Sequence, residues 1–198
     1  MSLDRKINRI QFLSGNSLKV IAVLTMLIDH LCKIVLQWLL SNYWGAMADN
    51  GQMSWERFRE IDYFIRFDLQ SIGTIAFPLF CFLLAEGFQH TRSKKRYIGL
   101  MLAFALISEV PFDIGFFSAY SRMEGTFPFY LKYQNVFFTL FLGLLTLVCL
   151  ERFSCKSDLP VDRIKSAVLQ VLSVVLFSGI AEGIHCDYGM QGILFISA

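Results

Sequence analysis

Residues 18–40 read LKVIAVLTMLIDHLCKIVLQWLL, an apolar run in which a lysine and a histidine stand eleven positions apart. About 20 apolar residues are enough to cross a bilayer as a helix. At about 100° per residue, four polar residues fall within a stripe about 60° wide, namely Lys19, His30, Lys33 and Gln37, and Asp29 lies on its flank. Charges at membrane depth are costly and usually face a bundle interior, a cavity or a pathway. The run therefore predicts a transmembrane helix that carries a functional site.

The whole chain has the composition of a membrane protein. Hydrophobic residues make up 55% of the 198 residues and charged residues 17%, and the mean hydropathy is +0.52. Several runs are apolar nearly all round, whereas surface helices of a soluble domain carry one polar face. The first run is not a cleavable signal, because a mixed polar segment precedes it and Asp29 and His30 lie inside it. We expect an integral membrane protein with lipid around it and no nucleic-acid partner.

The apolar runs predict an all-α, polytopic transmembrane bundle with five full spans and the start of a sixth. The five spans are 18–40, 72–88, 97–117, 135–150 and 164–181. The last run, 190–198, is too short to span, so we expect residues 1–198 to form a single membrane domain that is truncated at its C-terminus. Pro78 and Pro111 are expected to kink the second and third spans. A small polar stripe, Asn135, Thr139 and Gly143, is expected to be a packing seam.

The positive residues alternate between loops and predict the orientation. Three segments are rich in them: the N-terminus (Arg5, Lys6, Arg9), the second loop (Arg92, Lys94, Lys95, Arg96) and the fourth loop (Arg152, Lys156, Arg163). The positive-inside rule places these segments in the cytoplasm, and we expect a bacterial inner membrane. Several acids then trend towards the outer side: Glu109, Asp113, Glu182 and Asp187.

The cysteines and histidines predict no metal site. Five cysteines form no CxxC pair, and the three histidines are scattered along the chain. Buried cysteines commonly act as small apolar residues. We therefore expect no metal cofactor.

Several segments together resemble the TraX family, which is named for a conjugation protein that acetylates the N-terminus of pilin. They are GNSLKVIAVLTMLIDHL, FPLFCFLLAEGFQHTRSKKRY, ISEVPFD, NVFFTLFLGL and DYGMQGIL, in this order. The layout also resembles a wider class of transmembrane acyltransferases, including acyltransferase family 3 and the lysosomal heparan glucosaminide acetyltransferase. In acyltransferase family 3 a basic residue precedes the catalytic histidine by eleven positions, as Lys19 precedes His30. A basic RxxR-like element is matched loosely by Arg92 with Lys95 or Arg96.

The resemblance implies an acetyltransferase that takes acetyl from cytoplasmic acetyl-CoA, the expected acyl donor. A neutral imidazole suits the role of general base, so His30 is the expected catalytic residue. Asp29 is either a second catalytic residue or the partner of Lys33 in a local ion pair. The donor's phosphates would be held by the basic residues at the cytoplasmic end, namely Lys19, Arg92, Lys95 and Arg96.

The acceptor is expected to be an amine or a hydroxyl on a protein or a glycan. Candidate substrate-binding residues are Lys33, Glu86, Glu109, Asp113 and Asp187. Each also has a structural interpretation: Glu86 could pair with Lys19 or with the basic loop, and Asp187 could cap the helix that follows it. Two further function classes stay open. A transporter or channel would use the buried charges as an ion or proton relay, and a non-catalytic assembly partner would tolerate their replacement.

Overall fold

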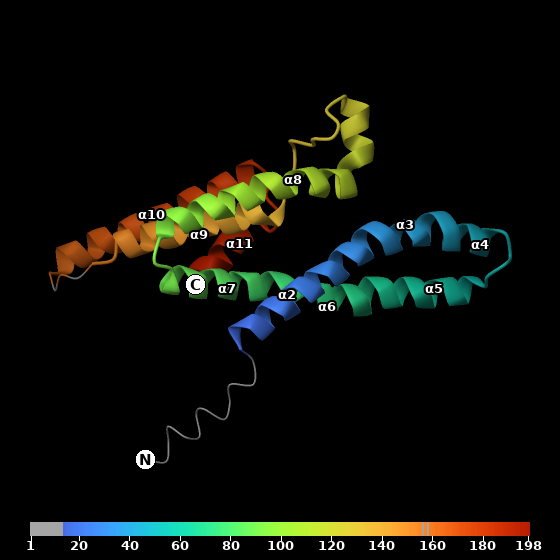
Figure 1. The fold of residues 1–198 in the computed structure, drawn as a ribbon, viewed down its shortest axis with the longest axis horizontal. Helices are drawn as coiled ribbons and strands as arrows, with labels where there is room; N and C mark the ends of the chain where they lie inside the picture. Colours follow the sequence, from blue (N-terminus) through green and yellow to red (C-terminus); the bar gives the residue numbers. More distant parts are fainter. Residues whose placement is uncertain (1–13, 156, 158) are drawn as a thin grey trace, which may run out of the picture. The chain divides into compact units, whose positions relative to one another are not determined.

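The computed structural model describes residues 14–155, 157 and 159–198. Over these residues the chain folds into helices, joined by turns and by one β-bridge between Gln134 and Cys186 (Figure 1). This confirms the predicted all-α class. The chain divides into two compact units, Met1–Leu83 and Leu84–Ala198.

The first unit is an antiparallel hairpin of two long helices (Figure 1). Its first arm is helical from Gly15 to Asp49. It contains α2 (Gly15–His30), η1 (Leu31–Leu36), α3 (Gln37–Leu39), η2 (Leu40–Trp44) and α4 (Gly45–Asp49), where η1 and η2 are π-helical. The Ser14 hydroxyl caps α2 by accepting the Ser17 N–H at 3.1 Å, which satisfies one of the free donors at this end.

The second arm returns alongside the first. It contains α5 (Trp55–Tyr63), the π-helical η3 (Phe64–Leu69), α6 (Gln70–Thr74) and α7 (Ala76–His90), whose last residues belong to the second unit. The regular helix is interrupted at Ile75. Pro78 has no N–H to give to the Thr74 carbonyl four positions earlier, which explains why the break lies here. Helix α6 packs on α2.

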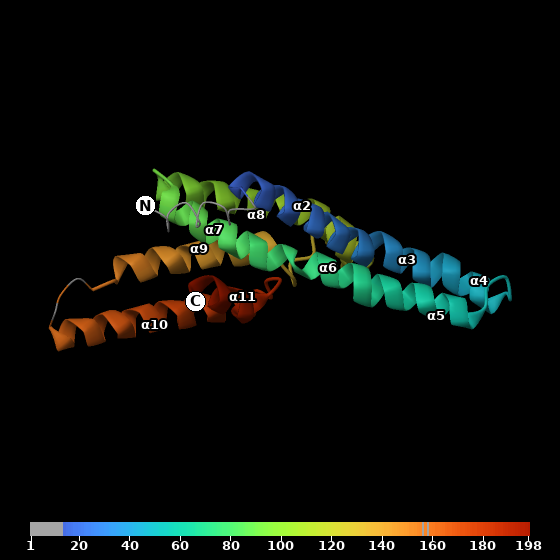
Figure 2. The same cartoon turned by 90° about the horizontal axis from the view of Figure 1, so that it is seen from below.

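The second unit packs three helices around α9. Its members are α8 (Lys94–Glu124), α9 (Val136–Arg152), α10 (Pro160–Gly183) and α11 (Gly189–Ser197), and α9 contacts the other three. Figure 2 shows α9 beside α10 and α11. Leu142, Ala181, Cys186 and Ile193 form the buried core. Helix α8, which contains Pro111, changes direction between its green and yellow parts (Figure 1).

The predicted packing seam on α9 lies within this unit. An ideal Cβ built on Gly143 would stand 2.3 Å from Cδ1 of Ile196. The glycine therefore lets α11 approach α9 closely, and Thr139 of the same stripe is fully buried. The seam was predicted from small residues at helical spacing, and the structure identifies α11 as the partner.

The number of spans differs from the prediction by one. Four helices of the described residues are long and apolar enough to cross a membrane: Gly15–Asp49, Trp55–His90, Lys94–Glu124 and Pro160–Gly183. Helix α9, predicted as a further span, has 17 residues, which extend about 26 Å. Helix α11 occupies the predicted final run with 9 residues. The predicted charges Arg5, Lys6, Arg9 and Lys156 lie outside the described residues.

Candidate functional site

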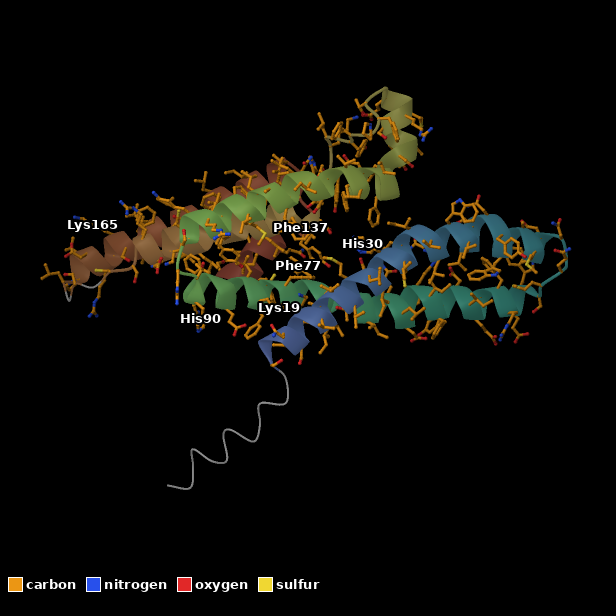
Figure 3. The ribbon with its side chains drawn as sticks, viewed as in Figure 1. Lys19, His30, Phe77, His90, Phe137 and Lys165 are labelled. Carbon is orange, nitrogen blue, oxygen red and sulfur yellow. The ribbon has the colours of Figure 1, made fainter. Side chains whose placement is uncertain are left out.

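His30 ends α2 with a defined ring orientation. Its Nδ1 lies 3.0 Å from the carbonyl oxygen of Met26. A carbonyl can only accept, so Nδ1 carries the hydrogen, and in the neutral ring the lone pair is on Nε2. Because α2 is regular from Gly15 to His30, Lys19 lies on the same side of the helix, about 16 Å away along its axis. Figure 3 shows both residues on α2. Lys19 itself is exposed.

Asp29 and Lys33 form an ion pair next to His30. The Lys33 Nζ lies 2.9 Å from Oδ2 of Asp29, and the His30 Nδ1 lies 3.7 Å from the same oxygen. Asp29 is 8% exposed, and its Oδ1 has no hydrogen-bond partner in the part of the chain that the structure describes. The local pair with Lys33 is therefore the main interaction of this carboxylate.

Gly73 of α6 makes the burial of Asp29 possible. A Cβ built on Gly73 would lie 2.7 Å from the Asp29 Cβ and 2.8 Å from its Cα. Only a residue without a side chain leaves room for this approach. No pattern in the sequence predicts that Gly73 touches Asp29, because the two residues are far apart along the chain.

The basic loop lies at the N-terminus of α8. The Ser93 hydroxyl caps the helix by accepting the Arg96 N–H at 3.4 Å. Arg92 and Arg96 contribute, with Thr91, Ser93, Tyr97 and Leu100, to a cavity of about 290 Å³, and Lys95 is exposed in the first turn. The positive end of a helix dipole together with guanidinium groups favours bound anions. This arrangement can hold part of a polyphosphate.

Lys94 has a different role from its basic neighbours. Its ammonium pairs with Glu151 near the end of α9 and stands 4.4 Å from the centre of the Phe88 ring. This residue ties the start of α8 to α9. Glu86 lies exposed on α7, and its backbone carbonyl is 2.9 Å from Nδ1 of His90.

Glu109 and Asp113 lie one turn apart on α8 and bind the main chain before α9. Asp113 is fully buried and accepts the Tyr130 N–H at 2.8 Å. Glu109, 7% exposed, accepts the Asn135 N–H at 3.3 Å and also bonds the Asn135 side-chain amide. Asn135 in turn caps α9 by accepting the Phe137 N–H. Each carboxylate keeps one buried oxygen without a hydrogen-bond partner among the described residues.

Asp187 lies in the turn before α11 and contacts α9 and the segment before it. Its carboxylate accepts the Tyr133 hydroxyl at 3.3 Å, and its carbonyl accepts the Thr139 hydroxyl. The alternative that Asp187 caps α11 is wrong, since Tyr188 occupies that position and no side chain caps it. Burial and the negative charge of Asp187 raise the pKa of Tyr133 to about 12.

Cys186 lies in the same turn as Asp187. Burial raises the pKa of its thiol to about 12, so the thiol stays protonated at neutral pH. Together with Tyr133 and Thr139 it forms a polar cluster at one end of α9. Sequence reasoning missed Tyr133, because a tyrosine in an aromatic-rich loop carries no local signal for a carboxylate partner.

Each unit thus gathers a different part of the predicted site. The first holds Lys19, His30, Asp29 and Lys33 on one helix. In the second, the basic residues lie at the start of α8, and Glu109 follows Arg96 by about 20 Å along the helix axis. Glu109 and Asp113 accept main-chain hydrogen bonds from the segment before α9 and anchor it to α8.

Comparison with known proteins adds family information. The model of the family described as "TraX protein" matches residues 14–198. A relative from Dichelobacter nodosus, named "Probable fimbrial assembly protein FimC, serogroup H1", is 29% identical over 186 residues. The match covers 92% of this chain and 59% of that protein, so this chain spans somewhat over half the length of its relative. No solved structure matches.

The family match extends over nearly the whole described chain and includes His30, the basic loop and the buried acids. Together with the four long apolar helices, it identifies an integral membrane protein. The chain belongs to the TraX family.

Proposed function

We propose that this protein is a membrane acyltransferase that moves acetyl from cytoplasmic acetyl-CoA to an amine or hydroxyl acceptor. The observation that carries the proposal is the state of His30. Its Nδ1 donates to the Met26 carbonyl, which makes Nε2 the basic nitrogen of the neutral ring. A histidine held in one tautomer in the middle of an apolar run is suited to general-base catalysis.

The reaction follows from this role. His30 Nε2 takes the proton of the acceptor amine or hydroxyl while the acceptor atom attacks the thioester carbonyl. The carbon–sulfur bond then breaks, the acetyl group stays on the acceptor, and the coenzyme A thiolate takes up the proton and leaves as a thiol. Lys33 is the candidate for stabilising the oxyanion that develops on the carbonyl. Asp29 acts as a positioning residue, because its ion pair at 2.9 Å holds the Lys33 ammonium in place.

The donor's phosphates are assigned to the start of α8. The cavity beside Arg92 and Arg96 has about 290 Å³, and a helix N-terminus opens towards it. Lys95, exposed in the first turn of α8, and Lys19, exposed on α2, are assigned to binding the same donor. A cytoplasmic donor requires the basic loops to face the cytoplasm, so the proposal includes a cytoplasmic N-terminus and a bacterial inner membrane, in agreement with the positive-inside rule.

For the acceptor we propose a pilin-like N-terminus or a glycan. The name of the relative refers to fimbrial assembly, which supports a surface-fibre protein as the acceptor. Glu109, Asp113 and Asp187 are assigned to the acceptor side, since buried carboxylates attract an acceptor that carries positive charge. Glu86 is assigned to the same substrate-binding set.

The test measures thiol release from acetyl-CoA by the purified protein in detergent, with pilin peptides, amines and sugars as acceptors. His30→Ala is expected to lower turnover by about 100-fold or more, the typical contribution of a general base. His90→Ala is the matched control, because its Nδ1 makes the same contact with the carbonyl four residues earlier. Near-normal turnover by His30→Ala, with correct membrane insertion, would refute the base assignment. A wild-type protein that transfers no acetyl to any acceptor but conducts ions would favour the relay alternative.

A further inference from the structure

The three π-helical segments of the first unit meet at one groove. Leu36 ends η1, Trp44 ends η2, and Phe64 and Leu69 bound η3. All four residues line a groove of about 430 Å³. Helical segments of this kind are rare and are frequent at functional sites. Three of them in one hairpin, all contributing to the same groove, mark this region as a site in its own right.

The groove overlaps the end of the first apolar run and extends beyond it. The two arms have 35 and 36 residues, or about 53 Å each, whereas the hydrocarbon core is about 30 Å thick. The apolar runs 18–40 and 72–88 lie at the same end of the hairpin, so the excess length lies between them in sequence. Leu36 lies inside the first run, four residues before its end, and Leu69 lies three residues before the start of the second run. Arg57, at the other end of the groove, is about 18 Å further along the second arm.

The walls and the far end of the groove differ in chemistry. Its walls are apolar and aromatic, formed by Leu36, Trp44, Ile61, Phe64, Ile65 and Leu69. At the far end, Arg57 donates to Glu60 at 3.0 Å. An alkyl chain fits the walls, and an adjacent guanidinium and carboxylate complement a phosphate next to an ammonium group.

We propose that this groove binds a membrane phospholipid with a zwitterionic headgroup, such as phosphatidylethanolamine. One acyl chain lies along the apolar walls and leads back to the bilayer at Leu36 and Leu69. The headgroup lies at the far end, where its phosphate accepts from Arg57 and its ammonium donates to Glu60. The volume of the groove falls within the range of about 300–1,000 Å³ that is usual for ligand sites. This role is independent of acyl transfer.

The experiment uses Trp44 as the reporter. The chain has three tryptophans, and replacing Trp38 and Trp55 with Phe leaves the one that lines the groove. Phosphatidylethanolamine with brominated acyl chains is titrated into the detergent-purified protein, and the quenching of Trp44 fluorescence is recorded. A bound lipid gives quenching that saturates at a low mole fraction, whereas random contact in the micelle gives a linear rise.

Variants of the ion pair test the headgroup contact. Arg57→Gln and Glu60→Gln are each expected to raise the half-saturating mole fraction about twofold to fivefold, as expected for an exposed ion pair. Arg66→Gln is the matched control, because Arg66 pairs with Asp62 on the same arm but does not line the groove. It is expected to leave the titration unchanged. Brominated phosphatidylglycerol, which lacks the ammonium group, is expected to bind more weakly.

Several results would overturn the proposal. These are a linear titration, a saturation curve that Arg57→Gln and Glu60→Gln leave unchanged, and equal binding of the two lipids. Trp44 fluorescence that no brominated lipid quenches would also overturn it, and would indicate that a polypeptide, such as a second copy of the chain, covers the groove.

Discussion

Replacing Gly73 with alanine tests the contact that buries Asp29. The new Cβ would stand 2.7, 2.8 and 2.9 Å from Cβ, Cα and N of Asp29, whereas carbon atoms pack at about 3.5–4.0 Å. Two of these three atoms are backbone, so α2 and α6 must separate by about 1 Å. Overpacking of this kind costs about 1–3 kcal/mol. Alanine also favours a helix over glycine by about 1 kcal/mol, which partly offsets the cost.

Comparing Gly73→Ala with Gly179→Ala cancels the gain in helix propensity that both variants receive. Gly179 lies inside α10, and a Cβ there would meet nothing within 4 Å, so this variant receives the same gain in helix propensity without a clash. The two variants should therefore differ by about 1–3 kcal/mol, which corresponds to roughly 2–12 °C in the apparent Tm of a chain of this size. Thermal unfolding in detergent, followed by circular dichroism, measures the difference.

Gly73→Ala should also disturb His30, the proposed general base. A shift of Asp29 moves its neighbour His30 and the Lys33 pair, so acetyl transfer should fall further in Gly73→Ala than in Gly179→Ala. Equal Tm values and equal turnover for the two variants would refute the claim that α6 packs directly on Asp29.

Three further predictions concern the second unit. The double substitution Arg92→Gln and Arg96→Gln should raise the KM for acetyl-CoA severalfold and weaken the dependence of KM on ionic strength. Steady-state kinetics in detergent at several salt concentrations measure both effects. An unchanged KM would leave these charges with a role in topology alone. Asn135→Ala should lower the free energy of unfolding by about 1–2 kcal/mol, because α9 loses its cap and Glu109 loses a donor. Asn135→Ser should keep much of that stability, because serine also caps helices. Equal thermal unfolding of the two variants would contradict this role of Asn135. The phenol of Tyr133 should ionise near pH 12 rather than 10. The unfolded state therefore releases this proton first, and the stability that Tyr133 contributes should be lost as pH rises from about 10 to 12. Ultraviolet titration of the protein and of Tyr133→Phe measures the ionisation of this phenol, and identical curves would contradict the raised pKa.

The sequence by itself determined the helical class and the register of the first helix. A long apolar run leaves the backbone no solvent partner, so it must form a helix. The regular spacing of α2 then places Lys19 and His30 on one side, as the sequence predicted. The final short run was also predicted as a helix for the same reason, and it forms α11.

Local pattern could not predict which residues meet from distant parts of the chain. Gly73 reaches Asp29, and the main chain at Asn135 reaches Glu109, because helices pack along faces that the sequence does not pair. The role of Asp187 was open for the same reason, and its hydroxyl partner, Tyr133, lies 54 residues earlier.

The π-helical segments are a second feature that only the tertiary structure decided. The hydrophobic periodicity of a helix is analysed at 3.6 residues per turn, so it does not predict the wider turns at η1, η2 and η3. Because these turns form where the two arms pack together, the groove between Leu36 and Arg57 could be found only from the folded hairpin.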